Sequence, residues 1–181
     1  MTIPNWINLD ITNRCTLQCP QCLRTWYYKK RPPGKDMTVE QFKQVLDYFY
    51  GILFCGQISD PIYHPKFIEF LNMSSSKFVK VNTAASHRSR AWYKEAFGVN
   101  RNAVWRFGID GLPKDSHKHR VNQDGEKLFD IMLMAKEMGL AVEWQVLTFN
   151  YVIPHLENIK RLANHHNLEL VLEEPRDQAI D

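Results

Sequence analysis

Short apolar and β-branched runs alternate along the chain with longer segments whose apolar residues repeat at helical spacing. The runs predict six strands, at residues 7–11, 51–56, 78–84, 104–110, 141–149 and 168–173. The helical spacing predicts helices over residues 38–50, 124–139 and 153–166. Because strands and helices take turns, we expect parallel strands joined by right-handed crossovers.

This alternation predicts an α/β fold, a partial (β/α)6 barrel of parallel strands that falls short of the eight units of a closed barrel. The 181 residues fit one domain, and we expect a single domain over residues 1–181. In folds of this kind the active site lies at the carboxyl ends of the strands. The loops that follow the strands are therefore expected to carry the chemistry.

The loop after the first predicted strand, within ITNRCTLQCPQCLR at residues 11–24, holds Cys15, Cys19 and Cys22. Thiolates bind zinc or iron–sulfur clusters. A structural zinc site takes four ligands, and the next candidates, Cys55 and His64, belong to another strand–helix unit. An iron–sulfur cluster with one open iron needs only three protein ligands. A zinc-stabilised binding module and an electron carrier remain alternatives, and Cys55, inside an apolar run, is typical of a small buried residue.

Composition indicates the setting of this chemistry. The chain is 44% apolar and 24% charged, with a net charge of +3. It has no apolar run near the ~18 residues that span a bilayer, and its first residues lack the features of a signal peptide. We therefore expect a cytoplasmic protein with no membrane partner, in a compartment where clustered cysteines serve a metal site rather than disulfides.

The spacing Cys-x-x-x-Cys-x-x-Cys after NLDITNRC, at the start of an α/β series, resembles the signature of the radical S-adenosylmethionine (radical SAM) superfamily. The resemblance implies that Cys15, Cys19 and Cys22 hold a 4Fe–4S cluster whose open iron binds S-adenosylmethionine. In that family one electron cleaves the cofactor to methionine and a 5′-deoxyadenosyl radical, which abstracts hydrogen from a substrate. The resemblance also implies an external one-electron donor such as a flavodoxin or a ferredoxin.

Two further segments resemble regions that hold the cofactor's charged groups in this family. SDPIYHP (59–65) resembles the Gly-Gly-Glu-Pro segment, with Asp60 in place of the glutamate that meets the amino group. FGIDGLPKDSHKHR (107–120) resembles the Ser-Ile-Asp-Gly segment, with Gly108 at the serine position and Arg120 as the cation for the carboxylate. Asp110 either faces the site or caps the turn that follows.

The remaining candidate residues lie at other strand ends and in the cysteine loop. VNTAAS (81–86) resembles the end of the family's third strand, which makes Asn82 and Thr83 polar contacts to cofactor or substrate. WQVLTF (144–149) resembles the fifth strand, which lies beside the adenine. The two-residue period puts Gln145 and Leu147 on one face of that strand and leaves open which face is the inner one. Gln21 stands where the family uses backbone atoms to contact the adenine.

The substrate is the least constrained part of the prediction. The chain resembles the compact core of peptide-modifying (SPASM-type) and phage-encoded members, and we expect it to lack the cysteine-rich extension that holds an auxiliary cluster. We therefore expect a peptide or protein side chain as the substrate. A nucleotide or nucleobase derivative is the alternative, because the run RTWYYKKRPPGK (24–35) mixes aromatic and basic residues.

Overall fold

The computed structural model describes residues 5–28 and 33–175 of the chain. All six predicted strands are present, and they form one sheet in the order β1-β2-β3-β4-β5-β6 with every neighbouring pair parallel. The strands are β1 (Trp6–Leu9), β2 (Gly51–Phe54), β3 (Phe78–Thr83), β4 (Val104–Gly108), β5 (Val142–Leu147) and β6 (Glu169–Glu173). The predicted α/β architecture of six parallel strands in an open sheet is therefore confirmed.

Helices follow the strands in the manner of repeated strand–helix units. The α-helices are α1 (Val39–Tyr48), α2 (Phe67–Met73), α3 (Arg90–Val99), α4 (Gly125–Glu137) and α5 (Leu156–His165). Shorter helical turns are η1 (Arg24–Tyr28), η2 (Pro61–Tyr63), η3 (Pro113–Lys118) and η4 (Ile153–His155). The helices predicted at 38–50, 124–139 and 153–166 correspond to α1, α4 and α5, whereas α2 and α3 were not predicted.

The ends of α1 and α4 show why these segments fold as predicted. Thr38 accepts a hydrogen bond from the Gln41 backbone N–H, and the Gln41 side chain accepts one from the Thr38 backbone N–H, which completes a capping box. Asp124 caps α4 by accepting from the Lys127 backbone N–H. The chain leaves α4 at Gly139, whose φ of 84° favours glycine.

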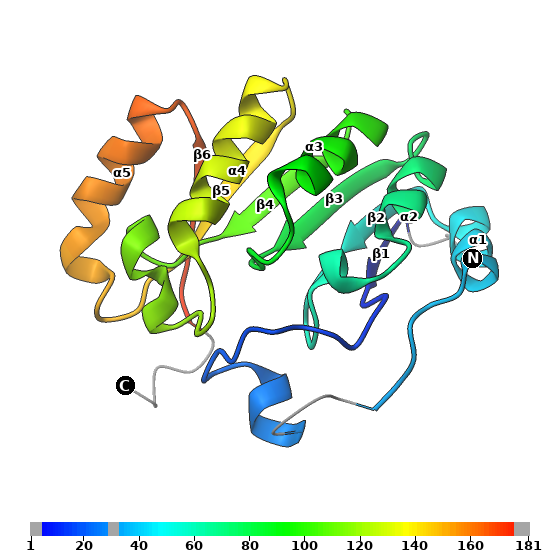
Figure 1. Ribbon diagram of the computed structural model, residues 1–181, viewed down its shortest axis with the longest axis horizontal. Coiled ribbons are helices and arrows are strands. Elements are labelled where there is room, and N and C mark those ends of the chain that lie inside the picture. Colours follow the sequence, from blue (N-terminus) through cyan, green and yellow to red (C-terminus); the bar gives the residue numbers. More distant parts are fainter. Residues whose placement is uncertain (1–4, 29–32, 176–181) are drawn as a thin grey trace.

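Helices α2, α3 and α4 lie side by side on one face of the sheet (Figure 1). Apolar side chains alternate along the strands toward this face, and Val81, Trp105, Phe107 and Trp144 are fully buried there. No helix in residues 5–28 and 33–175 is long and apolar enough to cross a bilayer.

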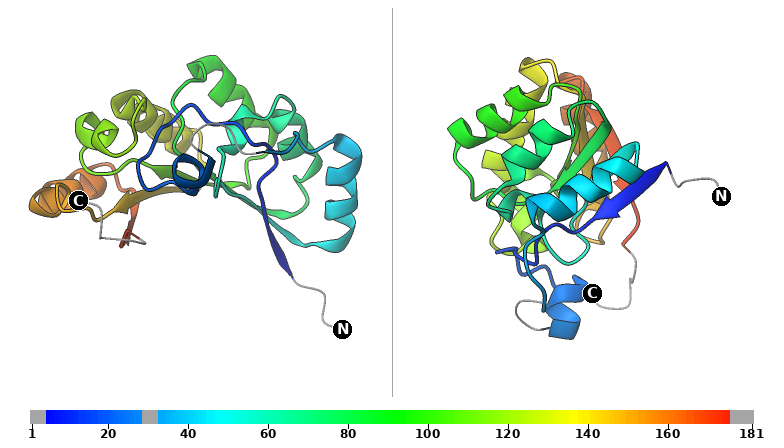
Figure 2. Two further views of the ribbon diagram at one scale, coloured as in Figure 1. Left: turned by 90° about the horizontal axis from the view of Figure 1, so that it is seen from below. Right: turned by 90° about the vertical axis from the view of Figure 1, so that its right-hand side faces the viewer.

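The opposite face of the sheet carries polar and charged residues. Lys80, Arg106 and Glu143 alternate with the buried apolar positions and are joined by ion pairs. Beyond the strands, the loop that carries the three cysteines runs across their carboxyl ends, as the view from below shows (Figure 2). This arrangement places the cysteines where the fold predicts an active site.

Candidate active site at the carboxyl ends of the strands

A cavity of about 380 Å³ lies between the cysteine loop and the carboxyl ends of the strands. Its volume falls within the range of sites that bind small molecules. Every predicted site residue except Asp110 lines it, namely Cys15, Cys19, Gln21, Cys22, Asp60, Asn82, Thr83, Arg120, Gln145 and Leu147. Residues chosen from five separate segments of the sequence are therefore brought together around one space.

The cysteine loop is fixed by bonds to its backbone. Arg24 donates to the carbonyl oxygens of Cys15 and Leu17, at 2.7 and 2.5 Å. The Gln18 N–H donates to the carbonyl oxygen of Val121, at 3.1 Å, and the Asn122 side chain donates to the carbonyl oxygen of Thr16, at 3.0 Å. The loop is thus held against the segment that follows η3.

The thiols of this loop fit an iron–sulfur cluster. Cys19 is buried, Cys15 and Cys22 are half-buried, and all three pack together with Leu17 and Ala84. Burial raises the pKa of Cys15 to about 12 and also raises the pKa of Cys19, so a metal must displace protons when it binds. Within the described ranges no three His, Cys, Asp or Glu side chains converge on a single-ion position. A cubane cluster has no such requirement, because each thiolate binds a different iron.

Cys55 at the end of β2 also lines the cavity. It is 6% exposed, and burial together with the nearby Asp10 charge raises the pKa of its thiol to about 11. The thiol is therefore protonated at neutral pH. The prediction of a small buried residue agrees with this burial, and the sequence pattern did not indicate that the residue borders the site.

Asp60 joins the loop after β2 to the end of β3. Its carboxylate accepts from the Thr83 hydroxyl at 2.9 Å and from the backbone N–H groups of Ala84 and Ala85 at 2.8 and 3.0 Å. The Ile62 N–H donates to it as well, at 3.3 Å. Burial raises the pKa of Asp60, while these donors favour the ionised form. Asp60 lines the cavity, but its hydrogen-bonding capacity is largely used by the chain itself.

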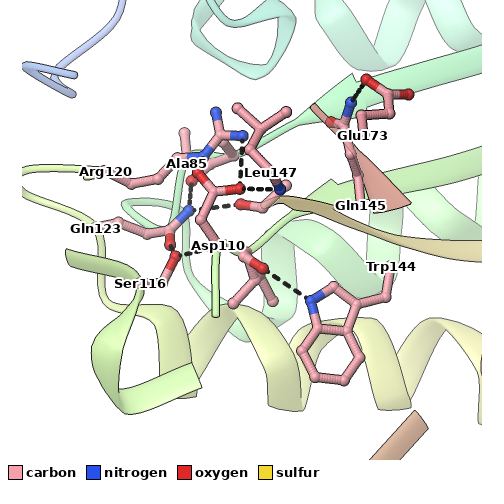
Figure 3. Close-up of polar contacts among 12 residues, drawn as sticks. Ala85, Asp110, Ser116, Arg120, Gln123, Trp144, Gln145, Leu147 and Glu173 are labelled. Carbon is pink, nitrogen blue, oxygen red and sulfur yellow. Dashed lines mark hydrogen bonds and ion pairs between the residues drawn. The ribbon is translucent and has the colours of Figure 1, made fainter. Parts of the chain in front are cut away.

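Arg120 is paired with Asp110 (Figure 3), which does not line the cavity. Nε of Arg120 is 2.8 Å from Oδ2 of Asp110, and Oδ1 of Asp110 accepts from the Leu147 N–H at 2.9 Å. Burial opposes the charge of Arg120, but Asp110 and Cys19 more than offset this and raise the pKa of Arg120. Arg120 therefore presents a permanent positive charge to the cavity.

The space beside Arg120 explains the glycine at position 108. A Cβ atom at Gly108 would lie 2.9 Å from one Nη atom of Arg120 and 3.1 Å from its Cζ. The guanidinium thus fills the space that a side chain at position 108 would need.

Gln123 and His119 were not among the predicted site residues. The Gln123 side chain donates to the carbonyl oxygens of Ala84, at 2.5 Å, and Gly108, at 2.9 Å, so it ties the end of β3 to the end of β4. His119 lines the cavity and packs against Phe149, with 4.0 Å between ring centroids and the rings tilted by 31°. Burial lowers the pKa of His119 to about 4, so the imidazole is neutral at neutral pH.

The structure resolves which face of β5 is the inner one. Gln145 and Leu147 line the cavity, whereas Trp144 is buried beneath the helices and donates through Nε1 to the carbonyl oxygen of Ile109, at 2.9 Å. The Gln145 amide donates to Oε2 of Glu173 at 2.7 Å (Figure 3). Glu173 and Glu174, at the end of β6, complete this part of the wall.

A family model described as the radical SAM superfamily matches residues 9–168. The chain belongs to the radical SAM superfamily. Its members are enzymes that use a 4Fe–4S cluster and S-adenosylmethionine, so the predicted class of protein and its cofactors are confirmed at the level of the family. A comparison with curated protein sequences gives no match.

Solved structures of radical SAM enzymes share the fold at low sequence identity. SuiB of Streptococcus suis, bound to the precursor peptide SuiA, is 10% identical with a TM-score of 0.76, over 96% of this chain and 40% of SuiB. Methylornithine synthase (PylB) is 16% identical with a TM-score of 0.72, over 93% of this chain and 52% of PylB. anSMEcpe, with bound S-adenosylmethionine and a peptide, is 14% identical with a TM-score of 0.71, over 94% of this chain and 51% of that one. The chain thus spans about half the length of these enzymes or less.

Proposed function

We propose that this chain forms the core of a radical SAM enzyme that acts on a peptide or protein side chain. Cys15, Cys19 and Cys22 hold the 4Fe–4S cluster in this proposal. The observation that carries it is the single cavity that these thiols share with Arg120 and the strand-end residues. Bound there, the cluster and S-adenosylmethionine supply a 5′-deoxyadenosyl radical that abstracts hydrogen from the substrate.

Arg120 binds the carboxylate of the cofactor in this proposal. A guanidinium suits a carboxylate because its N–H groups match both oxygens. Asp110 acts as a positioning residue, since it touches Arg120 and the Leu147 backbone but does not line the cavity. The ion pair keeps Arg120 extended toward the cavity when no cofactor carboxylate is present.

In this proposal the negative charge of Asp60 attracts the amino group of the cofactor. The backbone and hydroxyl donors around it favour the ionised form at the cavity wall, although burial raises the pKa of this carboxyl group. Because these donors occupy most of its acceptor positions, Asp60 makes no strong direct hydrogen bond to the ammonium. Its second task is to hold the end of β3, which brings Thr83 to the cavity.

The other predicted residues contact the nucleoside and the substrate. In this proposal Gln21 and Leu147, which line the cavity, contact the adenine. Oδ1 of Asn82 is buried without a hydrogen-bond partner in the described structure, which costs about 1–3 kcal/mol unless a ligand donates to it. Asn82 and Gln145 therefore offer amide groups to a bound molecule.

Peptide substrates are favoured over nucleotides by the comparisons. SuiB and anSMEcpe, two of the similar structures, hold peptides. The alternative, a nucleotide derivative, has its support in the aromatic and basic run at 24–35, of which residues 29–32 lie outside the described residues. An external one-electron donor such as a flavodoxin or a ferredoxin completes the proposal.

Anaerobic reconstitution with iron and sulfide tests the proposed function. The protein should bind about four irons per chain, as one cubane cluster requires, and turn brown. Addition of S-adenosylmethionine and dithionite should then release 5′-deoxyadenosine, measured by chromatography. Replacement of Cys15, Cys19 or Cys22 by Ala should abolish both results.

Cys55→Ala is the matched control, because it removes a thiol from the same cavity without touching the loop. It should retain the cluster. A protein that binds zinc in place of the cluster, or that loads the cluster and never cleaves S-adenosylmethionine, contradicts the proposal.

A further inference from the structure

One part of the cavity wall, at the carboxyl ends of β3, β5 and β6, offers hydrogen-bond acceptors. It consists of Asn82, Gln145, Glu173 and Glu174, which we call the acceptor wall. All four line the same cavity as the three cysteines. Their side chains are amides and carboxylates. An amide can present either its NH2 group or its oxygen, so the orientation of the two amides determines which ligand can bind.

Gln145 is oriented by its bond to Glu173. A carboxylate only accepts hydrogen bonds, so the group that meets Oε2 of Glu173, at 2.7 Å, is the amide NH2 of Gln145. Glu173 is itself fixed, because its Oε1 accepts from Arg106 at 2.9 Å. The amide oxygen of Gln145 is consequently the atom left for a ligand, and this oxygen can only accept.

Asn82 adds a second acceptor from two strands away. Its Oδ1 is buried and has no hydrogen-bond partner among the described residues. A buried carbonyl oxygen without a donor is unfavourable, and this one belongs to a residue that lines the cavity.

The charges around the acceptor wall sum to a negative value. Lys80 and Arg106 are balanced by Glu143 and Glu173, to which they are paired. The negative charge of Glu174, which is exposed at the mouth of the cavity, is not balanced by any of these four residues.

The positively charged side chains that line the cavity already have partners away from the acceptor wall. Among the described residues that line it, Arg24 and Arg120 are positively charged at neutral pH. Arg24 donates to the backbone of the cysteine loop, and Arg120 is paired with Asp110. The cavity therefore has a basic part beside the cysteine loop and an acidic, acceptor-rich part at β5 and β6.

We infer that the acceptor wall is the substrate subsite and that it takes a positively charged group with several N–H donors, such as the ammonium of a lysine or the guanidinium of an arginine side chain. The inference rests on the proposed peptide substrate. A group of this kind donates to the amide oxygen of Gln145 and is attracted by Glu174. An acidic or purely apolar side chain leaves this oxygen unpaired.

Peptide binding to the reconstituted protein, with S-adenosylmethionine present and no reductant, tests the inference. The probe is a nine-residue Gly/Ser peptide, acetylated and amidated at its ends, with one central lysine. The same peptide with norleucine keeps the four side-chain carbons of lysine and removes the charged amine, and a third version carries glutamate. Calorimetry should give a dissociation constant about five-fold lower for lysine than for norleucine, since the charge of Glu174 is exposed. The glutamate peptide should bind most weakly.

Glu174→Gln should remove most of the preference for lysine over norleucine. Glu169→Gln, on the strand β6 that Glu174 directly follows but outside the cavity, is the matched control and should keep it. The affinity for S-adenosylmethionine alone should stay within about two-fold in Glu174→Gln, because the charge of Glu174 faces the substrate.

Three results overturn the inference. They are equal affinities for the lysine and norleucine peptides, no measurable binding of any peptide, and a loss of S-adenosylmethionine affinity in Glu174→Gln as large as the loss of lysine-peptide affinity. The last result would assign the acceptor wall to the cofactor. Because the measurement needs no turnover, it is separate from the test of the proposed function: a protein that cleaves S-adenosylmethionine but shows no lysine preference contradicts only the inference.

Discussion

Gly108 and Asp110 hold the Arg120 guanidinium from two sides. Asp110 supplies the counter-charge at 2.8 Å, and the missing side chain at Gly108 leaves room for the Nη groups. The pair is buried, with side-chain exposures of 16% for Arg120 and 0% for Asp110. Breaking a buried pair by removing one charge leaves the other without compensation, which is strongly destabilising.

Asp110→Asn should therefore lower the free energy of unfolding by about 3–5 kcal/mol, measured by urea denaturation. The asparagine oxygen still accepts from the Leu147 N–H, so the loss isolates the charge of the carboxylate. Asp115→Asn is the control, because its partner Lys118 is 48% exposed, and it should cost less than about 1 kcal/mol. Equal losses of unfolding free energy in the two variants would show that the buried Asp110–Arg120 pair stabilises the fold no more than an exposed pair does.

His119 should make the protein sensitive to acid. Burial lowers its pKa from 6.5 to about 4, so the unfolded state binds more protons than the folded state between these values. The contribution of this histidine to the free energy of unfolding is fully present above pH 6.5. It is lost as the pH falls toward 4, which lowers the free energy of unfolding by up to about 3 kcal/mol. His119→Gln should flatten this part of the pH profile of the unfolding free energy. An unchanged difference between pH 7 and pH 4.5 would contradict the prediction.

Among the elements, the loop between β2 and η2 has little room for change. A Cβ atom at Gly56 would lie 2.2 Å from the backbone oxygen of Ser59, so a side chain there forces the loop to move. The same loop carries Asp60, whose N–H donates to the carbonyl oxygen of Arg14, at 3.0 Å. The loop thus supports both the end of β3 and the start of the cysteine loop.

Gly56→Ala should weaken S-adenosylmethionine binding by about ten-fold or more, since even a small displacement of positioning groups is costly, while the cluster is retained. Equilibrium dialysis and iron analysis measure the two effects. Gly98→Ala is the control, because no atom lies within 4 Å of a Cβ there. A Gly56→Ala protein with normal affinity would show that this loop adapts freely.

The sequence predicted the strands well and the helices less completely. Period-two and apolar runs place each strand within about two residues of its observed ends, as is usual for such patterns. The helix α2 (Phe67–Met73) has seven residues, which is shorter than the window over which helical periodicity can be recognised. Its first residue also lacks a side-chain cap.

The residues of the candidate site were likewise predicted only in part. Cys15, Asp60 and Arg120 were found because motifs at the ends of parallel strands converge in space. Gln123 was missed because its partners are backbone carbonyl oxygens, which leave no pattern in the sequence. The role of Gly108 depends on the space that Arg120 occupies, and Glu173 depends on contacts across strands. Such relations appear only once the chain is folded.

For the whole molecule, binding of the cofactor should be measurable as stability. A ligand that binds only the folded state at 100 times its dissociation constant adds about 2.7 kcal/mol to the unfolding free energy. S-adenosylmethionine should therefore raise the melting temperature of the reconstituted protein. Cys19→Ala, which removes the buried thiol of the loop, should lose most of this shift. A shift of equal size in Cys19→Ala would mean that the cofactor binds without the cluster.

The contacts between the cysteine loop and the segment after η3 have a consequence for biosynthesis. Thr16 and Asn122, which are bonded, lie 106 residues apart in sequence, so the loop reaches its final position only after more than half of the chain has been made. Until then the three thiols belong to an unanchored segment near the amino terminus. The cell must therefore keep them reduced and free of stray metals during translation, and cluster insertion is expected to follow, rather than accompany, the synthesis of β4 and α4.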